Sequence, residues 1–146
     1  MSGEVASALR AIAALPWLYP ALEIVHIVGI ALLLGSLVLV ELRIWGRAPE
    51  LPLQPLARFG LRLTLVGFAF AAASGTAMFL TQPGELLGNR PFLVKMGLLV
   101  CAGLNAAAFH RRGGLVRNDA FGRGQTLLSV GLWLAIIICG RSIAYY

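Results

Sequence analysis

The stretch ALEIVHIVGIALLLGSLVLVELR, residues 21–43, decides the fold class of this protein. A helix of about 20 apolar residues matches the thickness of the hydrocarbon core of a bilayer. Between Glu23 and Glu41, His26 is the only titratable side chain in the stretch. We therefore interpret residues 21–43 as a membrane-spanning helix with a histidine inside it, and the histidine needs a partner.

The composition of the whole chain supports the same interpretation. Of its 146 residues, 59% are hydrophobic and 12% are charged, and the mean hydropathy is +0.84. A soluble chain of this length could not cover several long apolar helices with polar surface. The sequence predicts an all-α integral membrane protein.

Four apolar segments recur along the chain, so we expect a single transmembrane domain over residues 1–146. The predicted spans cover residues 21–42, 58–81, 91–110 and 125–144. Because the connections are short, consecutive helices are expected to be antiparallel in an up-down-up-down four-helix bundle. Residues 4–15 are weakly amphipathic and are expected to form a short interfacial helix.

The arginines predict the orientation in the membrane. The connections after the first and third spans hold the larger set, Arg43, Arg47, Arg58, Arg111, Arg112, Arg117 and Arg123, whereas the opposite side holds Arg10 and Arg90. Positive residues favour the cytoplasmic side. Both termini are therefore expected in the periplasm of a bacterium, with the spans in the inner membrane. The net charge of +6 is explained by this topology, and no nucleic-acid partner is expected.

Small residues line one flank of each of the first two spans. Gly29 and Ser36 lie on the flank of the first span that carries His26. A comparable stripe on the second span consists of Gly67, Ala71, Ser74 and Met78. Such stripes allow membrane helices to approach closely, and we expect them to serve helix packing.

Three basic side chains are predicted at one depth in the membrane. At a rise of 1.5 Å per residue, His26 lies about 8 Å from the middle of its span, toward the periplasm. Lys95 and Arg141 lie about 9 Å toward the same side of theirs. Ionisable residues inside spans usually face the bundle interior and mark a site.

Further polar residues complete this predicted layer. Ser74 and Thr76 are expected at a similar level, and Glu23 one turn nearer the surface. The net positive charge of the layer favours an anionic or metal-centred ligand, and a neutral imidazole is a good iron or copper ligand. We therefore predict a cofactor site formed by His26, Lys95, Arg141, Glu23, Thr76 and Ser74, with His26 as the metal ligand. Two alternatives stay open: Lys95 and Arg141 could extend to the headgroups, and His26 could simply bond a backbone carbonyl.

A second polar layer is predicted toward the cytoplasm. It contains Glu41, Arg43, Arg62, Asn105 and His110. Glu41, Arg43 and Arg62 are expected to form ion pairs at the membrane interface. His110 lies about 20 Å or more from His26 along the bundle axis. The two histidines of one chain therefore cannot both ligate one haem.

The sequence lacks the residue sets that are typical of hydrolases and nucleotidases. The only aspartate, Asp119, falls in a cytoplasmic connection, and no Ser-His-Asp set is present. The segment GRGQT, residues 122–126, lacks the lysine of a phosphate-binding loop.

Four motifs together resemble an uncharacterised family of small four-helix bacterial membrane proteins. They are WLYPALEIVHIVGIALLLGS, ARFGLRLTLVGFAFAAASGTAMFL, NRPFLVKMGLLVCAGLNAAAFHR and LWLAIIICGRSIAYY. More distantly, three features together are similar to the membrane domain of copper-resistance protein D and to the HemJ-type protoporphyrinogen oxidase, which binds haem b. They are a histidine in the first span followed by glycines, a basic and aromatic start to the second span, and a lysine that opens the third.

The resemblance to the oxidase implies that His26 and Lys95 take part in haem binding. We accordingly expect haem b as a redox cofactor for electron transfer, with a membrane or periplasmic redox partner or a second copy of the chain. The chain departs from the oxidase in having ELRIWG after the first span and in adding Arg141. The alternatives are a copper-handling module and a non-enzymatic accessory or scaffold subunit.

Overall fold

The protein is described by a computed structural model that covers residues 2–146. Over this range it consists of helices and contains no strand. The elements are α1 (Ser2–Ala13), α2 (Leu18–Ile44), α3 (Leu53–Thr81), α4 (Pro83–Leu87), α5 (Arg90–Arg111), α6 (Gly114–Arg117), α7 (Ala120–Ser142) and the 3₁₀ helix η1 (Ile143–Tyr145). The predicted all-α four-helix bundle is confirmed.

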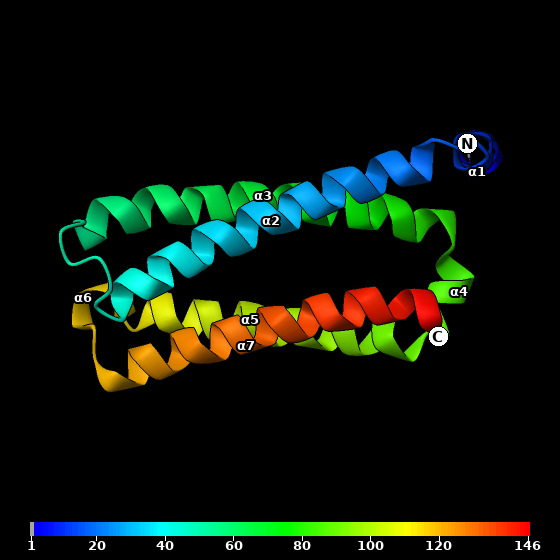
Figure 1. The fold of residues 1–146 in the computed structure, drawn as a ribbon. Coiled ribbons are helices and arrows are strands. Elements are labelled where there is room, and N and C mark those ends of the chain that lie inside the picture. The colour runs from blue at the N-terminus through cyan, green and yellow to red at the C-terminus, as the bar shows by residue number, and fades with distance from the viewer. Residues whose placement is uncertain (1) are drawn as a thin grey trace.

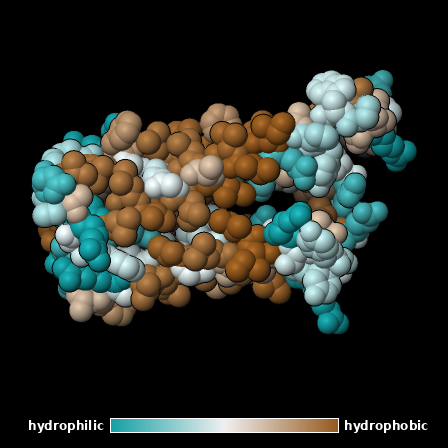
Figure 2. All heavy atoms as spheres, viewed as in Figure 1, coloured by the Kyte–Doolittle hydropathy of each residue, from teal (hydrophilic) through white to brown (hydrophobic). Residues whose placement is uncertain are grey.

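Four of these helices, α2, α3, α5 and α7, are long and apolar enough to cross a membrane. Figure 2 shows their side chains as a broad apolar belt with hydrophilic residues at both ends. Many large apolar side chains in this belt face outward, for example Ile24, Leu65 and Leu104. An outward apolar belt with polar ends fits a multi-pass membrane protein.

The helices begin earlier than the apolar segments suggest. Helix α3 begins at Leu53, directly after Pro52, and includes residues 53–57, a turn that precedes the predicted start at residue 58. Helix α7 begins at Ala120, where the side chain of Asp119 accepts a hydrogen bond from the backbone N–H of Gly122. The residues before the apolar part of α7 thus belong to the helix, whose first turn Asp119 caps. Hydrophobicity therefore indicated the apolar part of each helix and missed the first turn of α3 and of α7.

The four long helices are arranged as two antiparallel pairs, α2 with α3 and α5 with α7 (Figure 1). The end of the bundle that carries α1, α4 and the C-terminus is called the terminal end here. The end that carries α6 and the α2–α3 connection is called the basic end. The pairs meet at the basic end around a core of Val40, Ile44, Ala57 and Phe109. At the terminal end a hollow separates them (Figure 2).

Helices α2 and α3 touch at the level of their backbones. A Cβ atom on Gly29 would lie 2.7 Å from the backbone nitrogen of Ala71 and 2.8 Å from the carbonyl oxygen of Gly67. A Cβ atom on Gly67 would lie 2.5 Å from the backbone nitrogen of Leu33. The hydroxyls of Ser36 and Thr64, 2.8 Å apart, share a hydrogen bond farther along the contact. The small-residue flanks recognised in the sequence therefore form the contact between α2 and α3.

Replacing Gly29 by alanine tests this contact. The added methyl group has to displace backbone atoms of α3, so we expect Gly29→Ala to lower the free energy of unfolding by about 1–3 kcal/mol, the usual cost of overpacking. Thermal unfolding followed by circular dichroism in detergent micelles measures the change. The matched control is Gly35→Ala on the same helix, where a Cβ atom meets nothing within 4 Å and no loss is expected. Equal losses in both variants would contradict the proposed contact.

Candidate functional site

His26 lies at the contact between α2 and α3, in the half of the bundle toward the terminal end. Its Nδ1 atom is 2.8 Å from the carbonyl oxygen of Ala71 and 3.1 Å from the hydroxyl of Ser74. That hydroxyl is also 2.6 Å from the carbonyl oxygen of Phe70, to which it donates. A carbonyl oxygen only accepts, so Nδ1 carries the proton and donates to Ala71. In the neutral ring Nε2 then has a free lone pair.

Gly75 makes room for the imidazole ring. A Cβ atom at Gly75 would lie 3.2 Å from Cε1 of His26 and 3.5 Å from Nδ1. Residues Ala71, Ser74 and Gly75 on α3 thus form a seat for the ring, in which one carbonyl fixes its tautomer. The sequence identified Ser74 as a site residue but gave no sign that Gly75 contributes to the seat.

Lys95 extends from α5 along α7. Its Nζ atom would lie 3.3 Å from a Cβ atom placed on Gly140, so the glycine lets the lysine stem pass close to the helix. The side chain is partly buried. His26 and Ser74 are in contact, and Lys95 lies on the other helix pair in the same half of the bundle.

The other predicted members of this layer face outward. Arg141 donates a hydrogen bond of 2.8 Å to the hydroxyl of Tyr145 and lies 5.1 Å from the centre of that ring. Glu23 and Thr76 are exposed. Helical rise determines depth along the bundle axis, but the direction of a side chain around the helix depends on which neighbours the helix contacts. The sequence-based depths gave no such direction.

A second polar site lies between the helix pairs near the basic end, and Glu41, Asn105 and His110 of the predicted second layer line it. Glu41 is only 4% exposed, and its Oε2 atom has no hydrogen-bond partner in the part of the chain that the structure describes. The predicted ion pair at the interface is wrong for Glu41. Arg43 instead donates to the carbonyl oxygen of Leu51 at 2.6 Å, and Arg62 is exposed.

Glu41 borders a cavity of about 50 Å³ that residues from all four long helices line. Its polar side chains are Glu41, Asn105, His110, Gln125, Thr126 and Ser129. Several of these already have partners: the indole of Trp45 donates to Thr126 at 2.6 Å, and the Asn105 amide donates to the carbonyl oxygen of Gln125 at 2.9 Å. The hydroxyl of Ser129 approaches the Glu41 carboxyl. The cavity is therefore mainly apolar, with one buried acid inside it.

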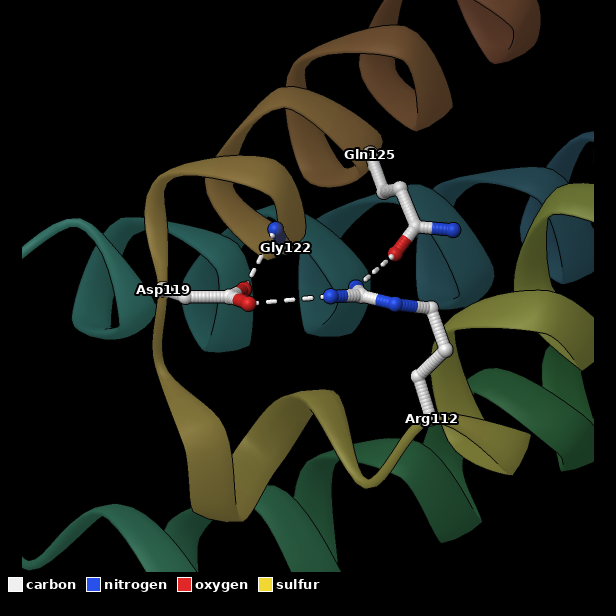
Figure 3. A network of polar contacts seen from close by, with 4 residues as sticks. All are labelled: Arg112, Asp119, Gly122 and Gln125. Carbon is white, nitrogen blue, oxygen red and sulfur yellow. Dashed lines mark hydrogen bonds and ion pairs between the residues drawn. The ribbon is translucent and has the colours of Figure 1, made fainter.

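A polar network near the basic end includes Gln125, which also lines the cavity (Figure 3). The Arg112 guanidinium lies 2.9 Å from a carboxylate oxygen of Asp119 and donates at 2.9 Å to the side-chain oxygen of Gln125. The other carboxylate oxygen of Asp119 accepts from Gly122 at 2.8 Å. This network connects the end of α5 to the start of α7. An aspartate directly before a helix is a recognised capping signal, so the sequence contained a clue to Asp119.

The metal-ligand content of the described residues is low. Over residues 2–146, no group of three or more histidine, cysteine, aspartate or glutamate side chains is arranged to hold a metal ion. His26 and His110 lie in opposite halves of the bundle, His110 at the cavity near the basic end. A metal-centred cofactor at the terminal end would thus depend on His26 for its histidine ligand from this chain.

Comparison with protein-family models, with curated proteins and with solved structures finds no match to this chain. The resemblance to the haem-binding and copper-handling membrane families therefore depends on the sequence motifs quoted above.

The Asp119 network predicts a pH dependence of stability. The pKa of Asp119 is lowered, first by the hydrogen bond from the Gly122 N–H and then by Arg112. Because the folded pKa is below the unfolded value of about 3.9, the stabilisation is complete above that value. It is lost as the pH falls through the folded pKa.

We expect wild-type protein to melt at a higher temperature than Asp119→Asn at neutral pH, with the difference disappearing in acid. Asparagine keeps the capping geometry, so this variant isolates the charge. Thermal unfolding in micelles across the acidic range provides the measurement, and Glu50→Gln, at an exposed carboxylate, is the control. A difference that stays constant into strong acid would show that the charge of Asp119 contributes nothing.

Proposed function

We propose that this protein is a small polytopic inner-membrane protein that binds haem b, or a related redox cofactor, at His26 and uses it for electron transfer. The observation that carries the proposal is the hydrogen bond from Nδ1 of His26 to the carbonyl oxygen of Ala71. Metal-ligating histidines typically donate their second ring nitrogen to a carbonyl or carboxylate, which orients the ring and fixes the tautomer. His26 has this arrangement, and its Nε2 is the nitrogen left to bind iron.

The surroundings of His26 fit a haem in two further respects. The helix pairs part at the terminal end (Figure 2), in the half of the bundle that contains the first turns of α2 and α5 (Figure 1). Lys95 would serve either as a second iron ligand or as the partner of a propionate, whereas Arg141 faces outward and contacts Tyr145. Bound haem supplies one-electron chemistry, and its potential depends on the axial ligand and on burial.

The orientation belongs to the same proposal. The arginine distribution supports a cytoplasmic basic end and a periplasmic terminal end. His26 would then exchange electrons with a partner at the periplasmic surface of the membrane.

An accessory or scaffold role is the second candidate function, and one observation favours it. The bond between His26 and Ala71 joins α2 to α3 directly, so the histidine would stabilise the pair without any cofactor. Copper handling is less well supported, because it would normally require several soft or imidazole ligands at one place, and His26 has no second histidine beside it.

Optical spectroscopy tests the haem proposal. We expect wild-type protein, purified and supplied with haem b, to show a Soret band that titrates to one haem per chain. His26→Ala should lose this band because the iron ligand is removed. His110→Ala should keep it, because His110 lies in the other half of the bundle. A Lys95→Ala variant distinguishes the two roles of Lys95: a shifted Soret band indicates ligation, and an unchanged band indicates charge pairing.

Thermal unfolding of the same variants separates haem binding from scaffolding. If the wild-type protein binds no haem while His26→Ala lowers the melting temperature, the haem proposal is wrong and the scaffold role is favoured. Ser74→Ala is the matched control, because it removes the hydroxyl beside Nδ1 and leaves the Ala71 carbonyl in place. Ser74→Ala should change the Soret band and the melting temperature less than His26→Ala does.

A further inference from the structure

The buried acid near the basic end points to a function that does not depend on haem binding. We propose that Glu41 is a proton-binding site, which takes up and releases a proton through cavity water and His110 to the aqueous phase at the basic end.

The first argument is that Glu41 has no counter-ion. It is 4% exposed and lies between both helix pairs, where an isolated carboxylate charge is strongly disfavoured. Apart from Glu41 itself, His110 is the only titratable side chain that lines its cavity. The other charged groups toward the basic end lie outside the lining; they include Arg43, Arg47, Glu50, Arg58, Arg62, Arg111, Arg112, Arg117, Asp119 and Arg123. The neutral acid is therefore the form that this environment favours.

The second argument is that one carboxyl oxygen of Glu41 has no hydrogen-bond partner. Oε2 of Glu41 is buried, and no described group bonds to it. Buried polar atoms nearly always have a partner in the protein or in ordered water. The cavity beside it, about 50 Å³ in volume, has room for water, which needs about 10–15 Å³ measured in the same way.

The size and lining of the cavity decide the class of ligand. Organic ligands occupy pockets of about 300–1,000 Å³, far more than this cavity offers. A metal cation would require several free oxygen ligands, whereas the side chains of Thr126 and Gln125 already bond Trp45 and Arg112. One carboxyl group and a little water are sufficient for a proton.

The third argument is access. His110 borders the cavity and is itself exposed at the basic end, one residue before Arg111 at the end of α5. One nitrogen of a neutral imidazole ring can accept a proton while the other donates one. In the transfer, the O–H bond of Glu41 breaks as a cavity water gains the proton, and that water passes a proton to a ring nitrogen of His110. His110 then releases its proton to bulk water, and the reverse sequence reprotonates Glu41.

Infrared spectroscopy of the reconstituted full-length protein tests the proposal. We expect the carbonyl-stretch band of a protonated carboxylic acid at neutral pH. The band should move to lower wavenumber in D₂O and lose intensity as the pH is raised. Glu41→Gln should lack the band, and the control Glu50→Gln should retain it, because an exposed carboxylate is ionised at neutral pH. His110→Ala should keep the band but slow its shift in D₂O.

Several results would overturn the proposal. A band that neither moves in D₂O nor changes with pH would make Glu41 a permanently neutral structural residue. A missing band, together with thermal stabilisation by sodium chloride but not by choline chloride, would make it a cation site. An unchanged exchange rate in His110→Ala would remove the histidine route. The pH and D₂O measurements use wild-type protein, so they remain decisive even if Glu41→Gln does not fold.

Discussion

The close approach of α2 and α3 at Gly29 and Gly67 is the contact on which the terminal half of the structure depends. In a bilayer, apolar side chains gain little by leaving lipid, so helices associate through close packing and hydrogen bonds. His26 lies about one turn from Gly29, and Ala71 lies about one turn from Gly67. Only backbones at this distance allow an imidazole on one helix to reach a carbonyl on the other. The packing contact and the orientation of His26 therefore have a common origin.

The two ends of the bundle satisfy their polar groups differently. Near the basic end, contacts between Trp45 and Thr126 and between Asn105 and Gln125 accompany an apolar core that holds the helix pairs together. At the terminal end the pairs separate, and the stacked rings of Phe79 and Phe92, 5.6 Å apart, join α3 to α5. The half near the basic end is closed around the buried acid Glu41. The half near the terminal end is more open, and His26 there is held in one orientation.

The sequence could predict that His26, Ser74 and Lys95 fall in the same half of the bundle, because positions along a helix can be counted from the middle of each apolar span. Arg141 had the same predicted depth, but it contacts Tyr145 on the outside of the bundle.

Glu41 was misjudged for a related reason. It stands at the end of an apolar segment, which suggested the membrane interface, yet α2 continues to Ile44 and keeps Glu41 inside the bundle.

The sequence by itself determined the all-α class, the four apolar spans, the small-residue flanks and the order of the polar side chains along each helix. These properties follow from hydrophobicity and from the constant rise of a helix, which act along one chain segment at a time. Only the tertiary structure decided that the bundle consists of two helix pairs and that His26 bonds Ala71. It also decided that Glu41 borders a cavity and forms no ion pair with an arginine. Such features depend on the rotation of each helix about its axis, and contacts with the neighbouring helices set that rotation.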